Sequence, residues 1–255
     1  TDNLAETTRF AFIVISHIFR KSGARQICFP VVNTSSAMLE IIAEYGDLVS
    51  PRLAESAHAR IISAARALGE KYRYDAVRAE RVSRLACRIY DQMRGEYGFE
   101  EQERLYLEVA ALLHNIGYFV SSKAHHKHSA LLISCADILG LGRNEMRIIG
   151  QIARYHRQAM PKSSHEEYME LPERDRIVVY RMGALLRLAD ALCPAPFVQV
   201  EELRVTTGEE SCLMGGRLSG QRCELLYILK LAVQRKSDLF TSFFGMNVIV
   251  ERLAG

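Results

Sequence analysis

Apolar residues recur at intervals of three and four along most of residues 5–193, and no other feature constrains the fold of this chain as strongly. The interval matches the turn of an α-helix, so each such segment can direct one apolar side toward a common core. The predicted helices span 5–22, 36–45, 51–72, 75–97, 101–117, 127–139, 143–158 and 173–193. One short strand is expected among them, at 26–32. The spacing therefore predicts a mainly α fold.

The pattern changes after Pro194 and Pro196, where polar and apolar residues begin to alternate. Alternation of this kind is typical of strands, and Gly208–Glu209 marks a turn between the first two. The expected elements are strands at 197–207, 211–220 and 246–253, and one helix at 221–240. We therefore predict a domain boundary near residue 196, with a small α+β subdomain after it.

Composition excludes several classes of protein. With 49% hydrophobic and 25% charged residues, the chain can bury an ordinary globular core. No apolar run approaches the roughly 18 residues of a membrane span, so we expect no membrane partner. The net charge of +3 is too small to argue for a nucleic-acid partner. The six cysteines are scattered and form no Cys-x-x-Cys pair, which favours free thiols in a reducing, cytoplasmic compartment.

Three polar side chains stand where the helical spacing places buried ones. Arg78 lies four residues before Val82 on an apolar seam, His114 continues the buried stripe of the next helix, and Asp190 lies four residues after Leu186. Taken singly, the histidine could be a satisfied core residue and the arginine could extend to solvent. A carboxylate on a core face is unfavourable unless it is paired or bound to a cation. We therefore expect the three to contact one another or a ligand.

A second group of candidates is basic. A helix N-terminus that carries cations is a suitable phosphate site, and His125, His126 and His128 are expected in the loop that leads into the helix at 127–139. The candidate phosphate-binding residues are Lys123, His125, His126, Lys127, His128, Arg154 and His156. A phosphate site, a solvated basic loop and a metal site all remain open for them. If they bind an anion, imidazoles with a pKa near 6.5 should make binding tighten as the pH falls from about 7.5 to 6.

Three stretches carry a family resemblance: "AALLHNIGYFVSSKAHHKHSALLI", "IIGQIARYHRQ" and "LLRLADALC". They resemble the C-terminal helical domain of the exopolyphosphatase/guanosine pentaphosphate phosphatase family, and more broadly the HD superfamily of metal-dependent phosphohydrolases. The resemblance runs from about residue 55 to the end of the chain. It implies an HD-like helical domain at 49–196, a C-terminal subdomain at 197–255, and the last helix–strand–helix of an actin-like domain at 1–48. The rest of that actin-like half, which the resemblance identifies as the catalytic one, is expected to lie outside this chain.

The chain departs from the HD pattern at two positions. By resemblance, HD enzymes hold a metal with a histidine, a His-Asp pair and a late aspartate. His114 and Asp190 match that set, but Arg78 replaces the first histidine and Asn115 replaces the first aspartate. A guanidinium cannot ligate a cation, and an amide is a weaker ligand than a carboxylate. We expect a degenerate metal site with no metal, in which Arg78 supplies the positive charge and pairs with Asp190.

Two functions follow, and the loss of two ligands favours the first. The first is a non-catalytic module that binds or guides polyphosphate or guanosine polyphosphate. The second is an HD-type phosphohydrolase that activates water on a reduced metal site made from His114, His126, His128, His156 and Asp190. No catalytic residue is assigned, and enzymatic activity stays open because the family hydrolyses phosphoanhydride bonds. We expect no cofactor in this chain, with Mg²⁺ left open for the intact protein, and the resemblance implies a homodimer.

Overall fold

The computed structural model describes residues 51–218 and 223–252, together with His17 and Lys21. Apart from these two residues, everything described belongs to one compact unit, Thr34–Gly255. The predicted helices at 5–22 and 36–45 and the predicted strand at 26–32 lie outside the described residues, as does the expected actin-like segment at 1–48.

The described part is mainly helical, with a small sheet near its end, which confirms the predicted fold class. The helices are α3 (Pro51–Lys71), α4 (Ala76–Tyr97), α5 (Glu101–Leu113), the 3₁₀ helix η2 (Ile116–Phe119), α6 (His125–Ser134), α7 (Arg143–Arg154), α8 (Glu166–Met169), α9 (Glu173–Ala191), α10 (Cys223–Gln234) and α11 (Asp238–Phe244). The strands are β1 (Val200–Thr207), β2 (Ser211–Leu218) and β3 (Asn247–Arg252). None of the described helices is long and apolar enough to cross a membrane.

Helix α4 shows how local sequence sets the boundaries. The carboxylate of Asp75 accepts a hydrogen bond from the backbone N–H of Arg78 at 3.0 Å, which caps the first turn. Gly98 ends the helix in the left-handed region, with φ of 60°, a conformation that favours glycine. Between these caps, one face of α4 is buried and carries Arg78 toward the molecule's interior.

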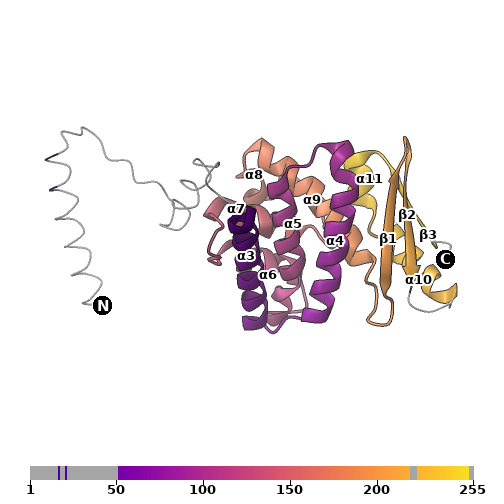
Figure 1. Cartoon of the computed structure of the whole chain (residues 1–255), viewed down its shortest axis with the longest axis horizontal. Helices are drawn as coiled ribbons and strands as arrows, with labels where there is room; N and C mark the ends of the chain where they lie inside the picture. Colours follow the sequence, from indigo (N-terminus) through magenta and orange to yellow (C-terminus); the bar gives the residue numbers. More distant parts are fainter. Residues whose placement is uncertain (1–16, 18–20, 22–50, 219–222, 253–255) are drawn as a thin grey trace. The chain divides into compact units, whose positions relative to one another are not determined.

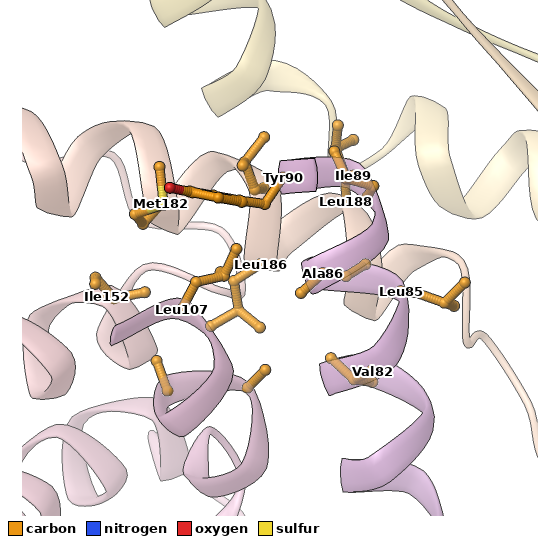
Figure 2. Close-up of a cluster of buried hydrophobic side chains, with 14 of the residues drawn as sticks. Val82, Leu85, Ala86, Ile89, Tyr90, Leu107, Ile152, Met182, Leu186 and Leu188 are labelled. Carbon is orange, nitrogen blue, oxygen red and sulfur yellow. The ribbon is translucent and has the colours of Figure 1, made fainter. Parts of the chain in front are cut away.

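Helix α9 is the central element of the core. It contacts α4, α5, α7, α10 and α11. Its residues 182–191 are all buried, as expected for a helix surrounded by others. Figure 2 shows Met182, Leu186 and Leu188 of α9 beside Leu107 of α5 and the apolar side chains of α4. Because burial of one such side chain contributes about 1.5–3 kcal/mol, the polar residues of α9 are held on a rigid support.

The chain between α5 and α6 differs from the prediction. Helix α5 ends at Leu113 instead of 117, and α6 begins two residues earlier and ends five residues earlier than the predicted 127–139. Gly117 explains the change of path, because a Cβ atom there would lie 2.1 Å from the carbonyl oxygen of His125. Backbone this close requires glycine, so η2 turns onto the first turn of α6. Helix α7 also ends earlier than predicted, and α8 was not predicted.

The C-terminal part packs directly on the helical bundle. Strands β1 and β2 are antiparallel around the predicted Gly208 turn, and β3 joins β2 in parallel. The edge strand β1 lies against α4 (Figure 1), where the amide of Gln92 bonds to the backbone of Leu203 and Val205 at 3.1 and 2.9 Å. The predicted boundary near residue 196 stays a prediction.

The prediction of one helix at 221–240 was wrong. The chain leaves the helical path at residues 235–237, which separate α10 from α11. The polar run Gln234–Asp238 offers no apolar side chain to continue the buried stripe, and Asp238 starts the new helix as an acidic first residue. The break matters because it directs Lys236 toward α9.

Candidate functional site

Asp190 is the centre of the candidate site. It lies near the end of α9, and only 4% of its surface is exposed. Its Oδ1 accepts a hydrogen bond from Nη2 of Arg78 at 2.5 Å, and its Oδ2 accepts one from Nζ of Lys236. Nε2 of His114 lies 3.5 Å from Oδ1. The predicted contact of Arg78 with Asp190 is therefore confirmed, and Lys236 is an additional partner that the sequence did not reveal.

The two cations reach this carboxylate from different parts of the chain. Arg78 comes from the first turn of α4, where its Nη1 also donates to the carbonyl oxygen of Cys193 at 2.6 Å. Lys236 comes from the segment between α10 and α11. Burial alone would raise the pKa of Asp190, but His114 and Lys236 outweigh burial and hold that pKa well below its usual range. Asp190 is therefore ionised at neutral pH.

Three histidines near Asp190 share one hydrogen-bonding arrangement. Nδ1 of His114 donates to the carbonyl oxygen of Ala111, and Nδ1 of His156 donates to that of Ala153, each at 2.6 Å. Nδ1 of His125 donates to a carbonyl at 3.2 Å in the same way. A carbonyl only accepts, so Nδ1 carries the hydrogen in each of the three rings.

The imidazole rings lie close to one another and are mostly shielded from solvent. The ring centroids of His114 and His156 are 5.0 Å apart, those of His125 and His156 are 5.4 Å apart, and Tyr118 stacks on His125 at 4.0 Å. Burial lowers the pKa of His125, lowers that of His126 to about 4, and lowers that of His156 well below its usual range. For these three rings the expected gain of charge between about pH 7.5 and 6 is contradicted, because desolvation disfavours the charged form. The predicted tightening of anion binding at lower pH stays a prediction.

A cavity of about 640 Å³ opens beside Asp190. It is lined by Tyr72, Arg73, Tyr74, Asp75, Arg78, Asn115, Tyr118, His125, His156, Arg157, Gln158, Asp190, Arg235 and Lys236. Five of these side chains are permanent cations at neutral pH and two are carboxylates. Within the described residues, Arg73, Arg157 and Arg235 form no ion pair with a carboxylate. We call this space the Asp190 cavity.

A second cavity, of about 370 Å³, lies along α6, α7 and α8. It contains Lys127, His128 and Arg154 of the predicted phosphate-binding set. Arg154 is neutralised there by Glu167 at 2.8 Å, and the nearby Arg147–Glu170 pair has a separation of 2.6 Å. This cavity therefore carries less unbalanced positive charge than the first.

The structure thus divides the predicted phosphate-binding set. His125 and His156 line the Asp190 cavity, whereas Lys123 and His126 line neither cavity. Helix α6 already begins at His125, so each successive residue is rotated by about 100° around its axis. Neighbours in sequence therefore face different cavities.

The residues of this site do not fit the metal ion of an HD enzyme. Among the described residues, no group of three or more His, Cys, Asp or Glu side chains is arranged to hold a metal ion. Both carboxylate oxygens of Asp190 already bond to cationic groups, so an ion would have to displace Arg78 or Lys236. Asn115 lines the cavity but supplies only a neutral oxygen.

A known protein family matches this chain. The family model described as Ppx/GppA phosphatase, domain III, matches residues 60–210, which is more than half of the chain. The chain belongs to the Ppx/GppA phosphatase family. The resemblance of the three sequence stretches to this family is thereby confirmed, and the match covers most of the helical bundle and the first strand of the sheet.

Curated relatives in the Ppx/GppA family are named guanosine-5′-triphosphate,3′-diphosphate pyrophosphatase. The protein of Vibrio parahaemolyticus is 35% identical over 123 residues, which are 47% of this chain and 23% of that relative. The Vibrio campbellii protein is 30% identical over 125 residues, covering 49% and 24% of the two chains. The Vibrio cholerae protein is 27% identical over 164 residues, covering 63% and 32%. The chain therefore spans about a quarter to a third of the length of these relatives.

Proposed function

We propose that this part of a Ppx/GppA-family protein is a non-catalytic module that binds a phosphate-rich anion in the Asp190 cavity. The observation that carries the proposal is the charge of the cavity lining. Five cationic side chains face two carboxylates, and Asp190 is already shared between Arg78 and Lys236. Arg73, Arg157 and Arg235 supply the positive charge that a ligand would neutralise.

The chemistry of these groups favours phosphates over other anions. A guanidinium presents a planar fork of donors that matches two phosphate oxygens, and three such forks suit a chain of several phosphates. A concave site lined by one sign of charge also concentrates ions of the opposite sign. The volume of about 640 Å³ lies within the range of ordinary ligand cavities. Polyphosphate and guanosine polyphosphate are both candidates, and the printed name of the relatives supports the second.

The protonation states in the cavity argue for binding without catalysis. Asp190 is ionised, but both of its oxygens accept hydrogen bonds from cations, so it is a poor base for activating water. His114 and Asp190 lack the other two ligands of an HD metal site, which disfavours the alternative of a metal-dependent phosphohydrolase. We place the hydrolysis named for the relatives in the part of those proteins that this chain does not span.

The proposal places the phosphate contacts differently from the sequence pattern. We include His125 and His156, which line the cavity, and leave out Lys123, His126, Lys127, His128 and Arg154. The second cavity, which holds the last three, is a competing location for the anion, and the experiment is designed to separate the two.

Binding of polyphosphate and of guanosine tetraphosphate to two triple variants tests the proposal. The first variant replaces Arg73, Arg157 and Arg235 with Gln. The matched control replaces three exposed cations outside the Asp190 cavity with Gln, namely Lys123, Lys127 and Arg143. We expect the first variant to bind at least about tenfold more weakly, and log affinity to fall less steeply with log salt, by about 0.7–0.9 per lost phosphate contact.

The two triple variants carry the same net charge, so general electrostatic attraction affects them equally. If the control loses as much affinity as the first variant, the ligand does not occupy the Asp190 cavity. If neither phosphate compound binds the unmodified chain at low salt, the proposed function is wrong.

A further inference from the structure

Arg187 is the largest fully buried side chain of the described residues, yet it lies outside the lining of the Asp190 cavity. It belongs to α9, one turn before Asp190. Its guanidinium makes three hydrogen bonds: Nε donates to the carbonyl oxygen of Tyr155 at 2.9 Å, Nη2 to that of Ala159 at 2.5 Å, and Nη1 to Oδ1 of Asp238 at 2.6 Å.

These acceptors belong to two separate walls of the cavity. Residues 155–159 form the first wall, and the cavity-lining residues His156, Arg157 and Gln158 lie between the two carbonyls that Arg187 bonds. Residues 235–238 form the second wall, in which Asp238 follows the cavity-lining Arg235 and Lys236. One guanidinium therefore connects both walls to the central helix.

Burial of this charge is difficult to explain by stability alone. Desolvation lowers the pKa of Arg187, although the hydrogen bond and charge of Asp238 oppose this effect. Removing a guanidinium from water costs free energy, so a buried arginine is weak evidence for a purely stabilising role. Every other residue from Met182 to Ala191, apart from Asp190, is apolar or glycine.

We propose that Arg187 is a positioning residue of the anion site, which fixes the first wall relative to the second. Arg157 on one wall and Arg235 and Lys236 on the other are then held at a fixed separation, so that one ligand can contact both walls. The ligand in this inference is that of the proposed function, whereas the connection between the walls can be tested without it.

Two substitutions of Asp238 separate positioning from charge. Asp238 is half-exposed, so changing it threatens folding less than changing Arg187. Asp238→Ala removes the acceptor of Nη1, whereas Asp238→Asn keeps an acceptor oxygen and removes the same charge. If Asp238 acts only through its charge, both variants should bind inorganic polyphosphate equally, and more tightly than the parent. We expect Asp238→Ala to bind about five- to tenfold more weakly than Asp238→Asn.

Hydrogen–deuterium exchange of the free protein gives the second readout. Asp238 and the first wall share Arg187 as a hydrogen-bond partner. We therefore expect Asp238→Ala to speed amide exchange at residues 156–160 as well as at the second wall, and Asp238→Asn to leave the first wall close to the parent. Exchange that rises at the second wall alone would overturn the inference, as would equal polyphosphate affinity of the two variants. Absence of polyphosphate binding to the parent would overturn the proposed function, and exchange would still decide the role of Arg187.

Discussion

At the scale of single residues, Asp190 is stabilised by two cations, and this determines how the site responds to mutation. Loss of Arg78 leaves Lys236 on Oδ2, and loss of Lys236 leaves Arg78 on Oδ1. Each single Ala variant should lower the free energy of unfolding by about 1–3 kcal/mol, as expected for one hydrogen bond to a charged group. The double variant should lose more than the sum, because the buried carboxylate then has no cationic partner. Urea unfolding of the four proteins measures this interaction energy.

If the losses in the free energy of unfolding of the two single variants simply add in the double variant, Arg78 and Lys236 do not stabilise the same carboxylate. Replacing Asp190 with Asn in the double variant is the control, since a neutral side chain needs no cation. We expect that replacement to recover part of the lost stability.

The buried histidines predict an acid-sensitive fold. The pKa of His126 is about 4 in the folded protein and that of His156 lies well below its usual range, in both cases mainly through burial. The unfolded chain, with histidine pKa values of about 6.5, therefore binds more protons than the folded chain as the pH falls below that value. We expect the free energy of unfolding, measured with urea at about pH 7.5, 6 and 5, to decrease steadily as the pH falls.

A variant with Gln at both positions cannot take up these protons, so its stability should fall less between about pH 6.5 and 5. The titration of Asp190 does not affect the comparison of these two proteins. Its depressed pKa affects stability only below the unfolded value of about 3.9. If the free energy of unfolding of the double variant fell as steeply as that of the parent, His126 and His156 would not be the source of the acid sensitivity.

Residue-level prediction from sequence succeeded where a side chain lay on a regular helix. Arg78 and Asp190 were found because helical spacing places each on an apolar face, and the ion pair follows from the cost of an unpaired buried charge. Lys236 and Arg235 were missed because they lie in a short break that was predicted as helix. Arg73 was missed because it lies in a turn with φ of 50°, where no periodic pattern indicates direction.

At the scale of elements, the path from α5 through η2 to α6 places the histidines, and two glycines test it. A Cβ atom at Gly117 would lie 2.1 Å from the carbonyl oxygen of His125 and 2.5 Å from the backbone nitrogen of Ser129, so Gly117→Ala forces two backbone segments apart. We expect a loss of at least about 2 kcal/mol in the free energy of unfolding, within the range of overpacking. Gly95→Ala is the matched control, because nothing lies within 4 Å of its Cβ position in α4.

The control substitution should have the opposite sign. Alanine in an exposed helix interior is more favourable than glycine by about 0.5–1 kcal/mol, so Gly95→Ala should stabilise the protein. Chemical denaturation of both variants measures the difference. If Gly117→Ala were as stable as the parent, the close packing of η2 on α6 would be wrong.

Element types were more predictable than element ends. Long amphipathic segments such as α4 and α9 were predicted almost to their limits, because caps and apolar stripes agree there. The start of α6 was misplaced by two residues, since its first turn, His125–His128, carries no apolar side chain to signal a helix. Because α6 begins at His125, this histidine lines one cavity whereas Lys127 and His128 line the other.

At the scale of the whole molecule, the bundle and the C-terminal part build the candidate site together. The bundle supplies Asp190, Arg78 and the histidines, and the segment between α10 and α11 supplies Arg235 and Lys236. The cavity therefore requires that α10 and α11 pack on α9. The sequence of the bundle or of the C-terminal part alone does not reveal this packing. The homodimer implied by the family resemblance stays a prediction.

Introduction of the two metal ligands that the HD resemblance implies at positions 78 and 115 tests why cationic groups surround Asp190. A ligand that binds only the folded state raises the midpoint of thermal unfolding. In the parent, Arg78 and Lys236 already bond both oxygens of Asp190, so millimolar Mn²⁺ should leave the midpoint unchanged relative to a sample with chelator. The double variant Arg78→His, Asn115→Asp removes one cation and adds an imidazole and a carboxylate beside His114. We expect Mn²⁺ to raise the midpoint of thermal unfolding of that variant. We expect polyphosphate to raise the midpoint of the parent, most strongly at low salt. If Mn²⁺ stabilised the parent as much as the variant, the cationic groups on Asp190 would not be replacing a metal ion, and the non-catalytic proposal would lose its physical basis.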